Sequence, residues 1–187
     1  TSGTYYVHWT VNSSCATTIG GETTTITFGT PPVQPPCGTA LPAGNACGVA
    51  TAICDFDGYC GNTSSAYTVN AWSQLGDAFC GSIENNSFLS FVADATTVSL
   101  NVWVNNCSNG NGIQIMIFSS SGICSGAVTS YTCYNQMFPG INTVTANGLT
   151  IGNTYYLMVD GYAGDICDYV VGVTASSGVL LPVTLNT

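Results

Sequence analysis

The sequence predicts an all-β fold, an antiparallel jelly-roll-like β-sandwich, and three observations support this prediction. Short segments rich in β-branched and aromatic residues recur along the 187-residue chain. Clusters of Gly, Asn, Ser and Asp separate these segments about every 8–12 residues, and no segment has the apolar period of a helix. Ten cysteines, an even number, indicate five disulfides and an oxidising compartment.

The N-terminal part of the chain contains two β-prone segments followed by a spacer. Residues 4–11 (TYYVHWTV) and 23–28 (TTTITF) are expected to be strands. Residues 31–36 (PPVQPP) are expected to form a semi-rigid polyproline-like spacer. Two interpretations remain open, because the strands either fold back onto their own sandwich as edge strands or add to the sheet of a neighbouring subunit. In the second interpretation the donated strand contacts its neighbour through Tyr5, Tyr6, Val7, His8, Trp9 and Val11.

Alternating polarity predicts half-buried strands in the middle of the chain. In residues 97–104 the side chains of Val98, Leu100, Val102 and Val104 share one face, and Trp103 lies on the other. Residues 87–93 alternate in the same way. Further β-rich runs are expected to be strands at residues 113–118, 128–134 and 142–146.

The last predicted hairpin is the most regular part of the sequence. It joins residues 154–159 to 169–173 through a loop rich in Gly and Asp. Tyr155, Leu157 and Val159 share an apolar face, which we expect to be buried. The resulting division is an N-terminal strand extension with its spacer at residues 1–36, a sandwich at 37–175 and a C-terminal strand or tail at 176–187.

Three stretches resemble a repeat domain of large secreted adhesin-like proteins of Bacteroidetes-type bacteria. They are residues 57–63 (DGYCGNT), 78–91 (AFCGSIENNSFLSF) and the hairpin at 153–173. That domain is similar to the pre-peptidase C-terminal and related jelly-roll β-sandwiches, and the resemblance covers roughly residues 47–173. Residues 181–185 (LPVTL) resemble the linker before the sorting domain of type IX secretion cargo. The resemblance implies a jelly-roll fold and an extracellular or cell-surface location, without a settled activity.

The charge balance excludes several classes of partner. The chain has no Lys or Arg and a formal net charge of -9. Binding of nucleic acid or of an anionic membrane surface requires cationic side chains, so neither partner is expected. No apolar run has the length of a membrane span, so membrane insertion is not expected either.

The residue inventory also argues against an enzyme. The single histidine, His8, lies on a predicted strand and leaves no Ser-His-Asp arrangement to propose. Glu84 with one aspartate is the only glycosidase-like carboxylate pair, and no basic side chain is available to tune it. We therefore expect a non-catalytic protein without an organic cofactor, and the cysteine spacing does not favour zinc.

Acidic residues near predicted loops suggest a structural Ca²⁺ site. The residues at 55–57 (DFD) have the spacing with which a calcium loop starts, and carboxylates are ligands that Ca²⁺ prefers. The alternative is that these carboxylates are solvated or hydrogen-bond their own turns. If they converge at one end of the sandwich, the ligands are Asp55, Asp57, Glu84, Asp160, Asp165 and Asp168.

Possible glycans and disulfides complete the candidate sites. Acceptor sequences for N-linked glycans begin at Asn12, Asn62, Asn85 and Asn106. Aromatic residues such as Trp72 and Trp103 could stack on sugars, although core packing is the commoner role of such residues. A Cys124–Cys133 disulfide would close a hairpin, and a Cys80–Cys167 disulfide would join two of the characteristic stretches. The other six cysteines allow fifteen pairings, and the sequence does not choose among them.

Two functions are compatible with these features. The first is a structural subunit of an extracellular bacterial filament or surface fibre, in which residues 4–11 form a strand of the next subunit and the main partner is another copy of the chain. The second is a secreted adhesin or carbohydrate-binding module of a larger cell-surface protein. The sequence favours the filament narrowly, and the two differ in where residues 1–30 pair.

Overall fold

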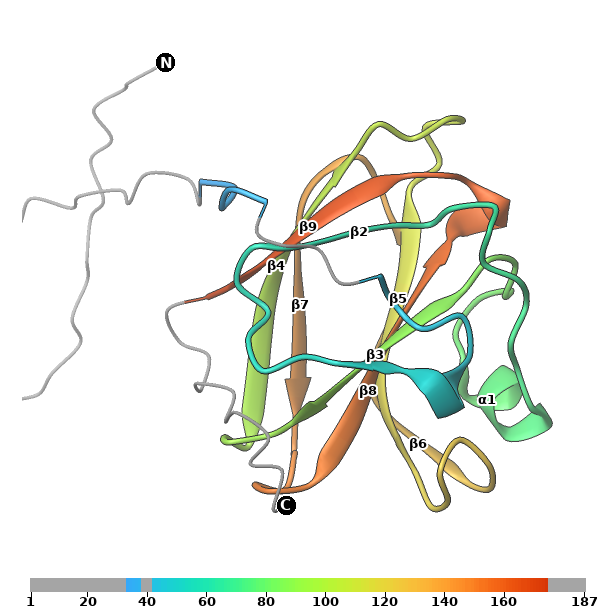
Figure 1. Ribbon diagram of the computed structural model, residues 1–187, viewed down its shortest axis with the longest axis vertical. Helices are drawn as coiled ribbons and strands as arrows, with labels where there is room; N and C mark the ends of the chain where they lie inside the picture. Colours follow the sequence, from blue (N-terminus) through green and yellow to red (C-terminus); the bar gives the residue numbers. More distant parts are fainter. Residues whose placement is uncertain (1–32, 38–41, 175–187) are drawn as a thin grey trace, which may run out of the picture. The chain divides into compact units, whose positions relative to one another are not determined.

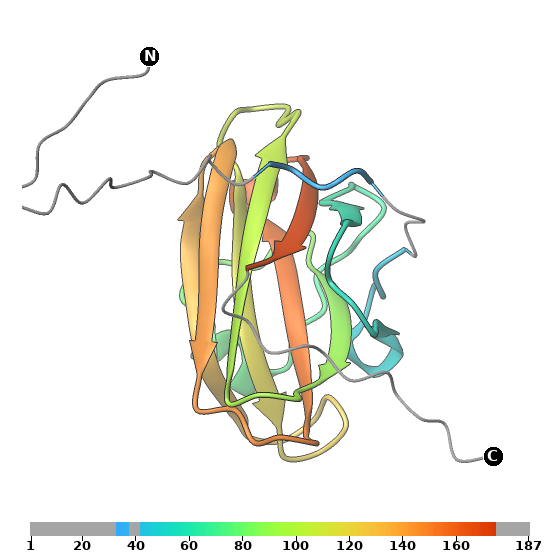
Figure 2. The ribbon, with the colours of Figure 1, turned by 90° about the vertical axis from the view of Figure 1, so that its left-hand side faces the viewer.

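Two β-sheets form the framework of the part of the chain that the computed structural model describes, residues 33–37 and 42–174. They stack face to face as a β-sandwich, so the predicted all-β fold is confirmed (Figures 1 and 2). The five-stranded sheet has the order β1 (Thr51–Ala52), β3 (Ser87–Val92), β8 (Thr154–Gly161), β5 (Ile113–Ser120), β6 (Val128–Met137). The four-stranded sheet has the order β2 (Tyr59–Asn62), β9 (Asp168–Val173), β4 (Thr97–Asn105), β7 (Gly140–Asn147).

Neighbouring strands are antiparallel except for β1 and β3, which are parallel. Three short helices lie in the connections of the described part of the chain. They are the 3₁₀ turns η1 (Cys47–Val49) and η2 (Tyr162–Gly164) and the helix α1 (Ser73–Ala78). No helix within the described ranges is long and apolar enough to cross a membrane.

The core between the sheets follows the alternation of the strands. On β8 the inward side chains are Tyr155, Leu157 and Val159, each at most 1% exposed, as predicted from the sequence. On β4 the predicted apolar face also points into this core, and Val98, Leu100, Val102 and Val104 are buried there. Burial of these two faces against each other removes apolar area from water and is the main stabilising contribution to the sandwich.

A second apolar cluster covers the outer face of the five-stranded sheet. Four fully buried side chains project from this face: Phe88, Met116, Phe118 and Met158. Leu75 of α1 packs against them with Phe79 and Cys47. Both faces of β8 are therefore buried, whereas the sequence predicted burial of one face only. The segment that covers this face, residues 72–83 with α1, is called the covering segment below. The difference arises because this segment lies far from β8 in the sequence and has no strand periodicity from which its position could be predicted.

Within the described residues, four disulfides join segments that are distant in the sequence. They are Cys37–Cys60, Cys47–Cys124, Cys80–Cys133 and Cys107–Cys167, and such bonds are typical of proteins outside the reducing cytosol. Cys54 is exposed and unpaired within the described part of the chain.

Both predicted disulfides are wrong, and the sheet order explains why. Cys133 pairs in register with Met116 on the covered outer face, so it meets the covering segment at Cys80. Cys167 directly precedes β9 and Cys107 follows β4, and these two strands are neighbours. Cys124 then bonds Cys47, the first residue of η1.

Several predictions fall outside the described residues. These are the two N-terminal strands, the donor-strand residues from Tyr5 to Val11 and the C-terminal segment after residue 174. Of the predicted N-terminal extension, the structure describes residues 33–36 alone.

Candidate functional site

The loops that join the strands at one end of the sandwich are organised by buried polar side chains. The residues concerned come from the segment before β3, from the segment between β4 and β5, from the end of β8 and from the β8–β9 connection. Three of them, Asn85, Asp160 and Asp165, are at most 6% exposed. Buried polar groups of this kind require hydrogen-bond partners or a counter-charge, so their partners define what the site does.

Asp165 holds the loop between β4 and β5 in place. Its Oδ1 accepts hydrogen bonds from the backbone N–H groups of Asn109 and Ile166, at 2.8 and 2.9 Å. Its Oδ2 accepts from the N–H groups of Asn111 and Gly112, at 2.7 and 3.1 Å. Burial raises the pKa of Asp165, but these four bonds outweigh that effect and the net pKa is lowered.

These contacts make Asp165 a poor cation ligand. A carboxylate offers about four lone-pair positions, and four N–H donors already use them. The neighbouring Cys107 and Cys167 sulfurs lie within 4.8 Å of the carboxylate, but they are joined in a disulfide and are not thiolates. Asp165 therefore acts as a structural anchor for the loop.

Asn85 connects three segments from inside the protein. Its Nδ2 donates to the carbonyl of Thr63 at 2.7 Å and to that of Asp165 at 3.3 Å, and its Oδ1 accepts from the N–H of Gly161 at 3.0 Å. The predicted glycosylation of Asn85 is wrong, because this side chain is buried and fully engaged. Among the other predicted acceptors, Asn62 and Asn106 are exposed, and Asn12 lies outside the described residues.

The half-buried Glu84 and the buried Asp160 form a carboxyl pair. The Oδ1 of Asp160 accepts the backbone N–H groups of Glu84 and Asn85, at 3.1 and 2.8 Å. Its Oδ2 is sealed from solvent without a hydrogen-bond donor, and so is the Oε2 of Glu84. Burial raises the pKa of Asp160 to about 7; the two N–H groups oppose the rise, and the adjacent Glu84 carboxyl adds to it.

Gln114 is a third member of this site that the sequence analysis missed. It lies opposite Asp160 in the register of β5 and β8, and its Oε1 is likewise buried without a donor. Its Nε2 donates to Asn135 Oδ1 on β6 at 3.1 Å. One signal was present in the sequence, because Gln114 is the single polar residue in an otherwise apolar run from Ile113 to Phe118.

The six predicted calcium ligands do not converge, so that part of the prediction is wrong. Glu84 and Asp160 lie together, whereas Asp165 is engaged with backbone donors. Asp57 accepts a bond from the N–H of Val173 at the end of β9, and Asp168 lies at its beginning. Five residues of strand separate those ends by about 16 Å. Asp55 is exposed and accepts the N–H of Asp57 in a local turn, which matches the alternative interpretation.

The outer face of the four-stranded sheet is a separate candidate surface. Trp103 is half-buried there and lies across Gly172, where an added Cβ would be 2.9 Å from the indole Cζ3. A groove of about 390 Å³ near the start of β9 is lined in part by Asn62, Asn105 and Asp168. Trp72 has a different role, because its Nε1 donates to the carbonyl of Gly126 and its ring packs near Phe118.

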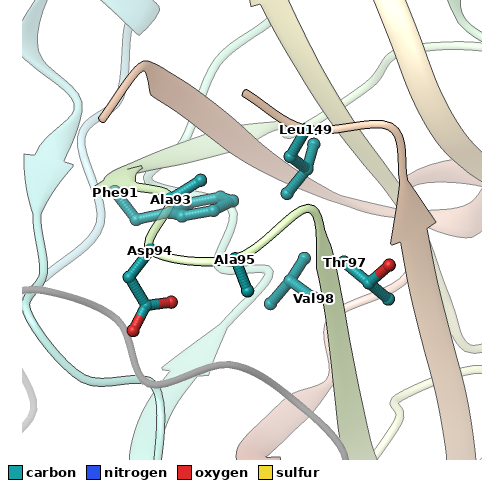
Figure 3. Close-up of a pocket in the computed structure, with 7 residues that line it drawn as sticks. All are labelled: Phe91, Ala93, Asp94, Ala95, Thr97, Val98 and Leu149. Carbon is teal, nitrogen blue, oxygen red and sulfur yellow. The ribbon is translucent and has the colours of Figure 1, made fainter. Parts of the chain in front are cut away.

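The opposite end of the sandwich is closed by apolar packing. Figure 3 shows Phe91, Val98 and Leu149 around a small pocket, with Asp94 pointing away from Leu149. This pocket has no room for a water molecule. It is a packing seam between the β3–β4 and β7–β8 connections and offers no ligand site.

Comparison of the chain with protein-family models found no match, and comparison with curated proteins found none either.

Proposed function

We propose that the chain is a non-catalytic structural subunit of an extracellular bacterial filament or surface fibre, assembled by strand donation between copies. The observation that carries this proposal is the edge strand β7. It is the last strand of the four-stranded sheet and pairs with β4 alone among the described strands. An unpaired strand edge is a template for another strand.

The composition of β7 favours strand addition. Soluble proteins commonly protect edge strands with Lys, Pro or inward-pointing charges. Gly140–Asn147 contains no charged residue and no proline, and Ile141 is 47% exposed. The chain has no Lys or Arg at all, so the commonest protective residue is missing everywhere.

Residues 4–11 supply a strand of suitable length and chemistry. They number eight, as do the residues of β7, and combine aromatic and β-branched side chains. Residues 31–36 then provide the spacer between the donated strand and its own sandwich. Backbone hydrogen bonds to β7 would provide affinity, and alternate side chains would fix the register.

The disulfides suit a subunit of a durable extracellular polymer. They constrain the unfolded chain and thereby stabilise each sandwich. The absence of Lys and Arg also removes every trypsin cleavage site.

A charge placed on the β7 edge tests the proposal. Ile141→Lys should reduce polymerisation strongly, because each added strand would have to bury or displace an ammonium group at the edge. Ile151→Lys is the matched control: Ile151 is 57% exposed on the turn between β7 and β8, outside the strand that would pair with an added one. Light scattering and negative-stain images of both variants measure the effect.

Equal polymerisation of the two variants would contradict addition at β7. Discrete monomers in the wild-type sample as well would favour the second function, a carbohydrate-binding module. Trp103 is the residue that favours this alternative. Its aromatic ring lies on a sheet face close to Asn105 and Asp168 and is suited to stacking on a sugar. Glycan binding that Trp103→Ala abolishes would then support it.

A further inference from the structure

The Glu84–Asp160 pair has no balancing positive charge among the residues that the structure describes. The chain contains no Lys or Arg, and its one histidine is His8, outside the described residues. The Asp160 side chain is 0% exposed, and the Glu84 carboxyl lies within hydrogen-bonding reach of it. Two carboxylates at this separation in a low-dielectric site repel each other strongly unless a cation or a proton lies between them.

The neighbouring residues close the site on the outer face of the five-stranded sheet. Gly164 packs beside Glu84, since a Cβ at Gly164 would be 3.8 Å from the Cβ of Glu84. Gly81 lies directly over the Gln114 amide, where an added Cβ would collide with Nε2. The segment before β3 and the β8–β9 connection therefore hold the acidic pair against the sheet.

The Gln114 amide is oriented to contribute a third oxygen. β5 lies between β6 and β8 in the sheet. Because the Nε2 of Gln114 donates to Asn135 on β6, its Oε1 lies on the side away from β6, which is the side of Asp160. Three oxygens are therefore buried without donors, Asp160 Oδ2, Glu84 Oε2 and Gln114 Oε1. Gln114 faces Asp160 across β5 and β8, and the Glu84 carboxyl interacts with Asp160.

We propose that Glu84, Asp160 and Gln114 bind one hard divalent cation of the Ca²⁺ class, which fastens the segment before β3 to the five-stranded sheet. Carboxylate and amide oxygens are the ligands that Ca²⁺ prefers, and Ca²⁺ tolerates an irregular set drawn from separate segments. Zinc and copper favour His or Cys ligands, and no described residue of these types contributes to this set of oxygens. Water or backbone carbonyls would complete the coordination.

A shared proton is the competing occupant, and Gln114 distinguishes it from a metal ion. A proton between Glu84 and Asp160 would satisfy the two carboxyl oxygens but would leave the Gln114 oxygen without a partner. A cation satisfies all three oxygens at once, and a buried acceptor without a partner is costly.

The first test is thermal unfolding of the full chain with its disulfides intact, after treatment with EDTA and then with added CaCl₂ at constant ionic strength. Ca²⁺ at 100 times its dissociation constant should raise the unfolding midpoint by about 5–10 °C. Isothermal titration calorimetry should give a stoichiometry of about one ion per chain for this site.

Substitutions that keep the shape of the site distinguish a loss of Ca²⁺ binding from a general loss of stability. In EDTA, Glu84→Gln and Asp160→Asn should be as stable as the wild type or more stable, because each removes the charge repulsion and adds an amide donor. Both should lose the response to Ca²⁺. Asp94→Asn is the matched control, since Asp94 lies at the opposite end of the sandwich, and it should retain the full response.

Two results would overturn the proposal. One is a wild-type midpoint that Ca²⁺ does not change, which would leave the shared proton as the occupant. The other is a Ca²⁺ response of equal size in Glu84→Gln, Asp160→Asn and Asp94→Asn, which would indicate general screening of an acidic chain.

Discussion

At the scale of single residues, the consecutive residues Glu84, Asn85 and Asn86 each connect the start of β3 to a different part of the molecule. Glu84 faces Asp160, and Asn85 bonds the backbone at Thr63, Gly161 and Asp165. Asn86 exchanges two hydrogen bonds with the backbone of Asn70, both 2.8 Å long. Buried amides suit this role because each one both donates and accepts.

Asp165 gives the residue-scale prediction. Asp165→Asn should destabilise the fold by about 3 kcal/mol, because the new NH₂ group would face backbone N–H donors that now point at a carboxylate oxygen. Denaturant unfolding measures this free energy. Asp168→Asn is the control: Asp168 is exposed and accepts one side-chain bond, so its replacement should cost about 0.5 kcal/mol or less.

The stability difference between wild type and Asp165→Asn should depend on pH. The pKa of Asp165 is lowered in the folded state, so its contribution is fully present above the unfolded value of about 3.9. That contribution is lost as the pH falls through the lower folded pKa. A difference that stays constant from pH 6 down to strongly acidic pH would contradict this role.

At the scale of elements, the covering segment with α1 converts a two-layer sandwich into one with a third, partial layer. Its apolar residues Leu75 and Phe79 pack on Phe118 and Met158, and two disulfides fix this layer at Cys47 and Cys80. A six-residue helix is not stable in isolation, so α1 depends on these contacts.

Removal of one of these disulfides should loosen the layer locally. In the double substitution of Cys80 and Cys133 by alanine, we expect faster hydrogen exchange in α1 while β8 stays protected, with a loss of about 2–4 kcal/mol in stability. The same substitution of Cys107 and Cys167 is the control. It should lower stability but leave the protection of α1 unchanged, and loss of protection in both variants would show that the layer is not a separate unit.

At the scale of the whole molecule, the strands were predictable and their neighbours were not. The alternation of apolar and polar residues identified the inner faces of β4 and β8, because successive side chains of a strand point to opposite faces of its sheet. It did not reveal that Met158 and Asp160 are covered, since that depends on contact with a segment about 80 residues away. The predicted disulfides failed for the same reason: Cys133 and Cys167 take partners set by the order of strands in each sheet.

The candidate site was partly predictable for a related reason. Glu84 and Asp160 were identified by residue type and by their place near loops, and they do lie together. Asp57 and Asp168 were grouped with them because sequence alone does not show that they occupy opposite ends of β9. Gln114 joins the site through cross-strand register with Asp160, which no local pattern encodes.

The most direct measurement for the proposed strand donation is electron microscopy of the purified native protein before and after deletion of residues 1–30. The proposal predicts long fibres in the intact sample and discrete sandwiches after deletion, because the strand that joins one copy to the next has been removed. Discrete monomers in both samples, or fibres that persist after the deletion, would contradict it.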